Sequence, residues 1–275
     1  IKEADIIYLN PFISFDNHKK IKERLYNTLK EHYNVSKREI DRAVENAYKE
    51  LYEYREDIAQ EGRRILNYLN QNSLRGIVLA GRPYHVDPEI NHGIPELITS
   101  LGFAVLSEDA LAYEFDEVDK LRVLDQWVYH TRLYRAADFV GKSKNLDMIQ
   151  LNSFGCGLDA VTTDQVNEIL MGHGKIYTVL KIDEVSNLGA SKIRIRSLAQ
   201  AIEGGGEPLP KDTRVKEIEF TSQMAENYTI LCPQMLDIHF DILVDILRTE
   251  GINIEILPDV DSETIDQGLK YVNND

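Results

Sequence analysis

The stretch GIVLAGRPYHVDP at residues 76–88 decides the fold class. Its first five residues are apolar or small and run directly into Gly81 and a polar turn, the pattern of a buried parallel strand that ends in a loop. Apolar residues then recur at helical spacing from Ile90 to Leu101, and Gly102 suits the C-terminal end of that helix. Residues 103–106 form the next expected strand, so the segment reads strand, loop, helix, strand.

The same order of elements recurs twice further along the chain. In the second unit we expect a strand at 148–151, a glycine-bearing loop at 152–157, a helix at about 160–171 and a strand at 176–182. In the third unit we expect a strand at 228–231, a helix at about 236–249 and a strand at 254–257. This alternation predicts an α/β fold, in which repeated βαβ units with right-handed crossovers form parallel sheets of the flavodoxin or Rossmann kind.

The N-terminal segment has a different pattern and is expected to be mainly helical. Ser36 and Glu39 form a capping box at the start of one helix. From Ile40 to Leu69, apolar residues recur mainly at three- and four-residue steps, which is typical of one face of a long amphipathic helix. The apolar run at 6–9 is a candidate strand.

These changes of pattern place the domain boundaries. We expect a helical segment at 1–72, an α/β domain with two βαβ units at 73–203, a glycine- and proline-rich linker at 204–210 and the truncated start of a further α/β unit at 211–275. The chain opens at Ile1 rather than at a methionine. We therefore interpret it as a piece of a longer polypeptide, whose remaining domains are expected partners.

Charge and cysteine usage exclude several classes of function. The formal net charge of -15 disfavours binding to nucleic acids and to anionic membranes. No apolar run of about 18 residues is present, so no membrane span is expected. The two cysteines, Cys156 and Cys232, exclude a disulfide scaffold and suit a reducing compartment, which indicates a cytoplasmic protein.

The loop after the first strand is the first candidate for ligand binding, because open parallel sheets bind ligands beyond the carboxyl ends of their strands. Its candidate residues are Arg82, Tyr84, His85, Asp87 and His92. Arg82 and the amides of the next helix would suit an anion. A metal would require His85 and His92 to converge although they are seven residues apart. In a purely structural alternative, Asp87 and Glu89 satisfy the start of the helix themselves.

The loop Ser153-Phe154-Gly155-Cys156-Gly157 is the second candidate. Glycines on both sides of Cys156 allow the backbone to approach a ligand, and a position before a helix can lower the pKa of a cysteine, which favours thiolate ligation. The alternatives are a buried structural cysteine and a nucleophile, and for the nucleophile no His partner is evident. Cys232 occupies the same place in the third unit, where burial as a small apolar residue is the alternative.

Two further segments contain residues with possible chemical roles. Asp183 and Glu184 follow a strand and either perform acid–base chemistry or form an ion pair with Arg194 or Arg196. Trp127 is expected in a helix with Leu121, Leu124 and Val128, with its side chain in the core of the protein. Neither a phosphate-binding loop of the P-loop type nor a dinucleotide fingerprint occurs, so no ATP or dinucleotide site is expected in this chain.

Four segments resemble the large CoA-substrate-specific enzyme activases, also called acyl-CoA dehydratase activase-related proteins: residues 79–95, 125–134, 150–160 and 181–198. The resemblance covers nearly the whole chain. It implies a region similar to the iron–sulfur subunits of 2-hydroxyacyl-CoA dehydratases, which have flavodoxin-like domains around a [4Fe-4S] cluster. It also implies that ATPase repeats lie elsewhere in such proteins and that an activase component delivers a low-potential electron using ATP. By this resemblance Cys156 is the first cluster-ligand candidate and Cys232 the second.

Two hypotheses about function follow from the resemblance. In the first, the chain is a dehydratase-like domain that helps to hold an iron–sulfur cluster and passes electrons toward a CoA-thioester reaction. A cluster would need ligands from outside the chain, because two cysteines do not complete a four-thiolate set, and the isolated chain is expected to be inactive. In the second, it is a non-catalytic module that docks an acyl-CoA, or a dehydratase or activase component, through the loop at 82–92.

Overall fold

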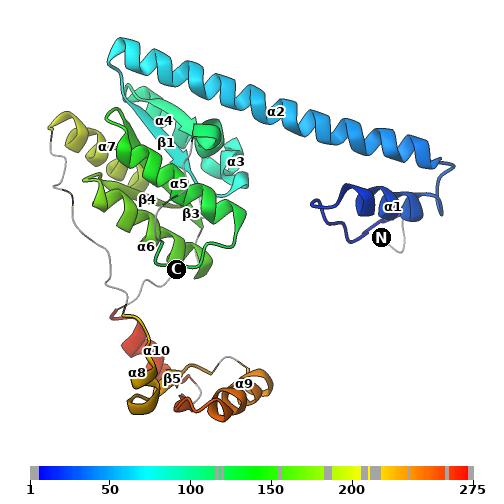
Figure 1. The fold of residues 1–275 in the computed structure, drawn as a ribbon. Coiled ribbons are helices and arrows are strands. Elements are labelled where there is room, and N and C mark those ends of the chain that lie inside the picture. The colour runs from blue at the N-terminus through cyan, green and yellow to red at the C-terminus, as the bar shows by residue number, and fades with distance from the viewer. Residues whose placement is uncertain are drawn as a thin grey trace. The chain divides into compact units, whose positions relative to one another are not determined.

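A computed structural model describes residues 6–114, 118, 121–153, 157–182, 188–205, 210, 218–234, 236–257 and 260–271. The chain divides into two compact units (Figure 1). One comprises Ile1–Leu74 together with Asp109–Glu114, and the other comprises Arg75–Glu108 together with Phe115–Asp275. None of the described helices is both long and apolar enough to cross a lipid bilayer.

The first unit is built on a helical hairpin of α1 (His18–Leu29) and α2 (Lys37–Asn72). Ser36 caps α2 and forms the expected capping box with Glu39, which confirms the predicted start of the long helix. Ile21 of α1 packs against Ile40 and Val44 of α2 in a small apolar cluster. Residues 6–9 form no strand, so that expectation was wrong.

The second unit contains a four-stranded parallel sheet, which confirms the predicted α/β class. Its strands are β1 (Gly76–Ala80), β2 (Ala104–Ser107), β3 (Leu146–Ser153) and β4 (Tyr177–Ile182). Their order is β2-β1-β3-β4. This is the order of the first four strands in flavodoxin-like folds, and it places the reversal of winding between β1 and β3. Seven of the eight residues of β3 are buried, as expected for a central parallel strand.

Helices cover both faces of this sheet. On one face lie α4 (Ile94–Ser100) and α7 (Gly189–Glu203), and on the other lie α5 (Val128–Lys142) and α6 (Gly157–Gly172) (Figure 1). Ile98, Ile149 and Leu198 belong to the apolar core between α4, α7 and the sheet. Among the described residues there are also two 3-10 helices, η1 (Pro83–Val86) and η2 (Glu108–Glu114).

One predicted helix is divided in two. We expected a continuous helix from Ile90 to Leu101, but α3 (Pro88–Asn91) ends at His92 before α4 begins. His92 has a φ of 53° and Gly93 a φ of 80°, both in the left-handed region, which a continuing right-handed helix does not contain. The apolar spacing was therefore read correctly, but the break in the backbone was missed.

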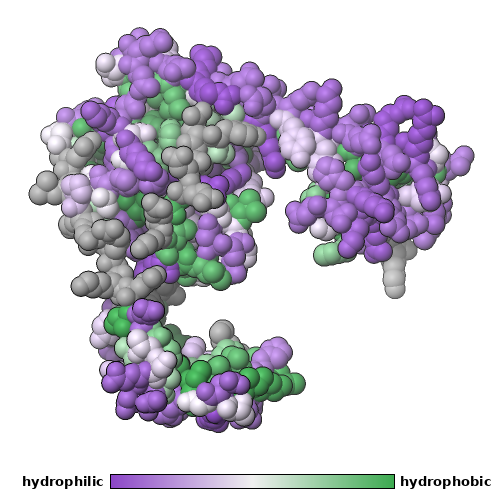
Figure 2. All heavy atoms as spheres, viewed as in Figure 1, coloured by the Kyte–Doolittle hydropathy of each residue, from purple (hydrophilic) through white to green (hydrophobic). Residues whose placement is uncertain are grey.

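The C-terminal part of the chain forms the third expected βαβ unit. It comprises α8 (Ser222–Asn227), β5 (Ile230–Cys232), α9 (Asp237–Thr249), β6 (Ile254–Ile256) and α10 (Ser262–Gly268). Strands β5 and β6 pair in parallel. Apolar residues gather over α9 in Figure 2, and Ile238, Ile242 and Ile246 are exposed there.

Candidate functional site

The candidate site lies where the carboxyl ends of β1 and β3 are neighbours. Ala80 pairs with Gln150, so the turn after β1 begins beside the last residues of β3. Because the winding of the sheet reverses between these two strands, this edge is the position at which open parallel sheets bind ligands. Two of the predicted loops, at 81–92 and 152–157, therefore start at the switch point of the sheet.

A buried ion pair joins the turn after β1 to the first turn of α6. The Arg82 guanidinium donates to Asp159 through Nη2 at 2.8 Å and Nε at 3.1 Å. The Asp159 side chain is 5% exposed and that of Arg82 is 25% exposed. Since a carboxylate buried without a partner would be strongly destabilising, this pair fixes the turn against α6. An anionic ligand would have to compete with Asp159 for the same guanidinium.

His85, Ser153 and Tyr84 form a hydrogen-bonded chain across the two strand ends. The backbone N–H of Arg82 donates to His85 Nδ1 at 3.0 Å. An Nδ1 that accepts a hydrogen bond leaves the proton of a neutral imidazole on Nε2. Nε2 lies 3.3 Å from Ser153 Oγ, and this oxygen lies 2.8 Å from the Tyr84 hydroxyl. His85 therefore donates to Ser153 and cannot accept the proton of Ser153, as the base of a Ser–His nucleophile would.

Burial keeps this imidazole neutral. His85 is 3% exposed. The low-polarity surroundings lower its pKa, with Asp159 raising the pKa and Arg82 lowering it as smaller effects. A neutral His85, a serine hydroxyl and a tyrosine hydroxyl together form a site of fixed hydrogen-bonding groups. The Tyr84 ring is 47% exposed, so this group can meet a ligand from solvent.

Gly81 makes this geometry possible. A Cβ at this position would collide with His85 Nδ1 and would lie 3.1 Å from the carbonyl oxygen of Leu151. The absence of a side chain at Gly81 thus allows the imidazole to fold back over the turn. The glycine that was read in the sequence as the end of a strand is also required by the site.

Sequence reasoning missed two residues of this region, Asp159 and His130. His130 lies in the first turn of α5 and is 7% exposed. Its pKa is lowered mainly by burial and secondly by Arg82, while Asp159 and Asp125 raise it. Both residues fall within segments that carried the family resemblance, which was the only signal in the sequence that could have identified them.

Trp127 does not lie in the core, so that expectation was wrong. It precedes α5, is 46% exposed and contacts the His130 ring edge-on at 5.4 Å between centroids. Apolar neighbours at 121, 124 and 128 suggested a buried helix face, but the helix begins only at Val128. The indole therefore lies at the surface beside His130.

The remaining candidate ligand-binding residues of the first loop, Asp87 and His92, stabilise the ends of α3. Asp87 caps α3, where its Oδ1 accepts from the backbone N–H of Glu89 at 2.9 Å. His92 ends α3 in the left-handed conformation. Within the part of the chain that the structure describes, no group of three or more His, Cys, Asp or Glu residues could hold a metal ion.

Three candidates fall outside the described residues, namely Cys156, Asp183 and Glu184. Ser153, the last residue of β3, is the nearest described residue before Cys156. Cys232 is a free, half-buried cysteine at the end of β5. Arg194, a predicted partner of Asp183 and Glu184, donates to the carbonyl oxygen of Val179 at 2.8 Å.

Comparison with known proteins identifies one family. Residues 1–111 match the family model described as CoA enzyme activase uncharacterised domain (DUF2229). This match covers residues 1–74 of the first unit, continues through β1, the Arg82–Tyr84–His85 turn and β2, and ends within η2. No match to a curated protein or to a solved structure was found.

Proposed function

From the premise that residues 1–111 belong to the CoA enzyme activase family, we propose that this chain is the dehydratase-like part of an ATP-dependent activase and 2-hydroxyacyl-CoA dehydratase system. In this proposal the functional site of the chain is the edge of the sheet around Ser153. The chain helps to hold an iron–sulfur cluster there and passes electrons toward a CoA-thioester reaction. The ATPase and the remaining cluster ligands belong to other domains or to a partner component.

The observation that carries this proposal is the convergence of two loops on the switch point. Tyr84 and His85 follow β1, Ser153 ends β3, and hydrogen bonds of 2.8 Å and 3.3 Å join them. A strand end fixed in this way gives the following segment, which contains Cys156, a rigid starting point. Redox sites require such support because fixed ligands and fixed hydrogen-bond donors set the potential of a cluster.

The donor set of this chain does not fit a complete [4Fe-4S] site. Such a cluster takes four thiolates, whereas the chain has two cysteines. Of the two, the described residues include only Cys232, at the end of β5. We therefore propose only that Cys156 contributes one thiolate to a cluster that further cysteines complete.

Anaerobic reconstitution tests this role of Cys156. Iron and sulfide are added to the chain together with the partner component, and bound iron and the EPR spectrum of the reduced sample are measured. We expect Cys156→Ser to lose the cluster signal, and Cys232→Ser tests whether the second candidate ligand also contributes. A cluster that forms with unchanged iron content and spectrum in Cys156→Ser would refute the assignment.

A second candidate function is a docking module for an acyl-CoA, favoured by the partly exposed side chain of Tyr84. The donors beside it are neutral, because Asp159 pairs with the Arg82 guanidinium and His85 is uncharged. Such donors suit the uncharged thioester carbonyl better than a phosphate. Calorimetry with an acyl-CoA should then show about tenfold weaker binding for Tyr84→Phe, the loss of about one hydrogen bond. Equal affinities would reject this contact.

A further inference from the structure

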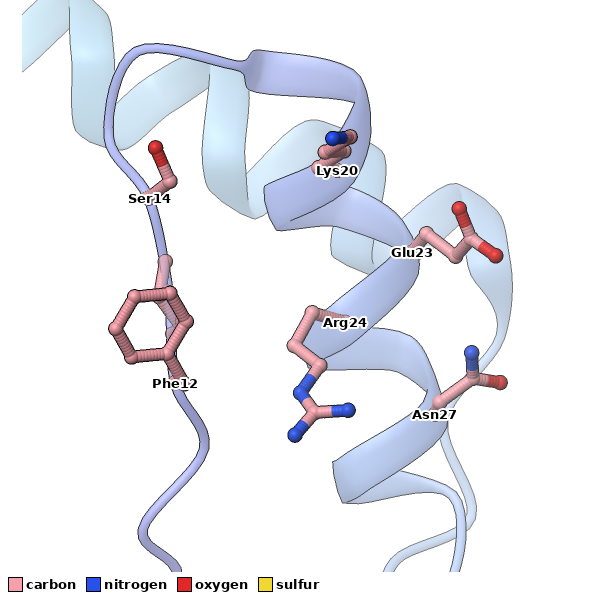
Figure 3. Close-up of a pocket in the computed structure, with 7 residues that line it drawn as sticks. Phe12, Ser14, Lys20, Glu23, Arg24 and Asn27 are labelled. Carbon is pink, nitrogen blue, oxygen red and sulfur yellow. The ribbon is translucent and has the colours of Figure 1, made fainter. Parts of the chain in front are cut away.

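The helical hairpin carries a second concave surface, which the proposed function does not use. A depression of about 570 Å³ lies between the segment at 12–14 and α1 (Figure 3). Its size falls within the range of about 300–1,000 Å³ that is typical of small-molecule sites. It is lined by Phe12, Ile13, Ser14, Lys20, Glu23, Arg24 and Asn27.

Two cations of this depression have no partner within the described residues. Lys20 and Arg24 are one helical turn apart on α1, and no described hydrogen bond or ion pair occupies their side chains. In Figure 3 the Arg24 guanidinium extends into the space between α1 and the segment that carries Phe12. Glu23 is the one carboxylate of the lining, so two positive charges face one negative charge.

A neighbouring depression offers a useful contrast. It has a volume of about 470 Å³ and is lined by residues that include Lys22, Tyr26 and Lys37. Lys22 is already bound to Glu45 at 2.7 Å, and the Lys37 ammonium lies over the Tyr26 ring at 5.3 Å. Its cations are therefore partly satisfied within the protein, whereas those of the first depression are available to a ligand.

The charge of the segment at 6–37 agrees with an anionic ligand in this depression. Residues 6–37 contain six Lys or Arg residues and three Asp or Glu residues, although the chain as a whole has a net charge of -15. This segment is thus locally basic in an acidic protein. A local reversal of sign of this kind attracts anions to one surface only.

The aromatic ring at the edge of the depression specifies the ligand further. Phe12 is 85% exposed although it is apolar. An exposed aromatic ring beside unpaired cations is the combination by which proteins bind a nucleotide, since the base stacks on the ring and the cations meet the phosphates. Ser14 and Asn27 add polar groups that can bind a sugar or a base edge.

We propose that the depression between Phe12 and α1 binds an adenine nucleotide, with Arg24 and Lys20 on the phosphates and Phe12 stacked on the base. Two sources share this chemistry, namely free ADP and the nucleotide end of CoA. The site lies in the first unit and is separate from the Tyr84–His85–Ser153 site. The nucleotide site can therefore be rejected by experiment without rejecting the Tyr84–His85–Ser153 site, and the reverse also holds.

Calorimetry on the whole chain tests the proposal with four probes: ADP, CoA, pyrophosphate and pantetheine. We expect ADP and CoA to bind and pantetheine, which lacks both phosphate and base, not to bind. CoA binding at least tenfold tighter than ADP would identify CoA as the source, and comparable affinities would identify the free nucleotide. Absence of ADP binding would overturn the proposal.

Variants locate the site. Arg24→Gln should weaken ADP binding about tenfold or more, the effect of losing one charge-assisted contact. The control is Lys49→Gln, which removes an exposed cation of α2 that pairs with Glu53 and lies outside the lining. Phe12→Leu should weaken ADP binding but not pyrophosphate binding. Tyr84→Phe should leave ADP binding unchanged. Equal ADP affinities in Arg24→Gln and the parent chain would refute the assignment.

Discussion

Arg82 and Arg24 show how differently the two units of this molecule use the same side chain. Arg82 lies at the end of a buried parallel strand and is held by Asp159, with Nη2 at 2.8 Å from Oδ1. Arg24 lies on the exposed side of a short helix and has no partner among the described residues. A paired and largely buried cation supports structure, whereas an unpaired and exposed cation is available for binding.

The two arginines differ because the two units bury different amounts of their chain. The sheet unit buries residues on both faces of β3, and this allows polar groups such as His85 and Asp159 to be held away from water. The hairpin buries only Ile21, Ile40 and Val44 in its cluster, so its charged residues remain in water. Fixed hydrogen bonds are therefore expected at the sheet edge, and attraction of anions at the basic segment of residues 6–37.

The largest expected effect separates the two arginines by stability. Arg82→Ala leaves the Asp159 carboxylate buried without its partner and should lower the free energy of unfolding by about 3–5 kcal/mol. Arg24→Ala should change it by no more than about 0.5 kcal/mol, as is usual for an exposed site. Urea unfolding measures both. Similar losses in the two variants would invalidate the comparison.

Acid should destabilise the sheet unit through His85. The pKa of His85 is lowered from 6.5 by burial, so the unfolded chain binds the proton more readily than the folded chain. Stability is therefore lost as the pH falls below 6.5, by at most about 1.4 kcal/mol per pH unit for one histidine. His130 acts in the same direction. His85→Asn should have a shallower dependence between pH 7 and pH 5. An unchanged slope would mean that His85 is not kept neutral.

A smaller effect is expected at the start of α2. Ser36 Oγ accepts from the Glu39 backbone N–H and donates to the Glu39 carboxylate, so Ser36→Ala removes the side-chain half of the capping box. The expected loss is about 1 kcal/mol, with Ser36→Asp as a control that keeps a capping oxygen. Hydrogen exchange should show faster exchange at the first turn of α2, while exchange in β3 stays unchanged. Faster exchange in both places would show that the hairpin and the sheet unfold together.

The smallest effect on stability is expected at Tyr84. Its half-exposed hydroxyl exchanges a hydrogen bond to Ser153 for bonds to water, so Tyr84→Phe should change the free energy of unfolding by about 0.5 kcal/mol or less. Thermal unfolding followed by circular dichroism measures this. A loss of several kcal/mol would show that Tyr84 supports the fold and is not free to serve a ligand.

Local patterns in the sequence predicted the strands and the long helix, because each is set by the spacing of its own apolar residues. The run at 76–80 became β1, and the spacing after Ser36 became α2. The break at His92 and Gly93 was missed because apolar spacing does not report backbone conformation, although Gly93 was a visible break signal in the sequence.

The site was predicted less completely, because its main pair joins residues far apart in the chain. Arg82 was singled out, but its partner Asp159 is 77 positions away and is brought near it only by the crossover between β1 and β3. His130 depends on the same packing. Without an observed strand order, neither contact follows from spacing, charge or residue type.

The protonation of His85 tests the central claim most directly, namely that the ends of β1 and β3 form one preorganised hydrogen-bonded site. Long-range proton–nitrogen correlation spectra of the labelled chain, with His85→Asn to assign the signals, report which ring nitrogen carries the proton. We predict a neutral ring at pH 7 with the proton on Nε2 and with Nδ1 accepting from the Arg82 amide. A proton on Nδ1, or a doubly protonated ring, would contradict the account.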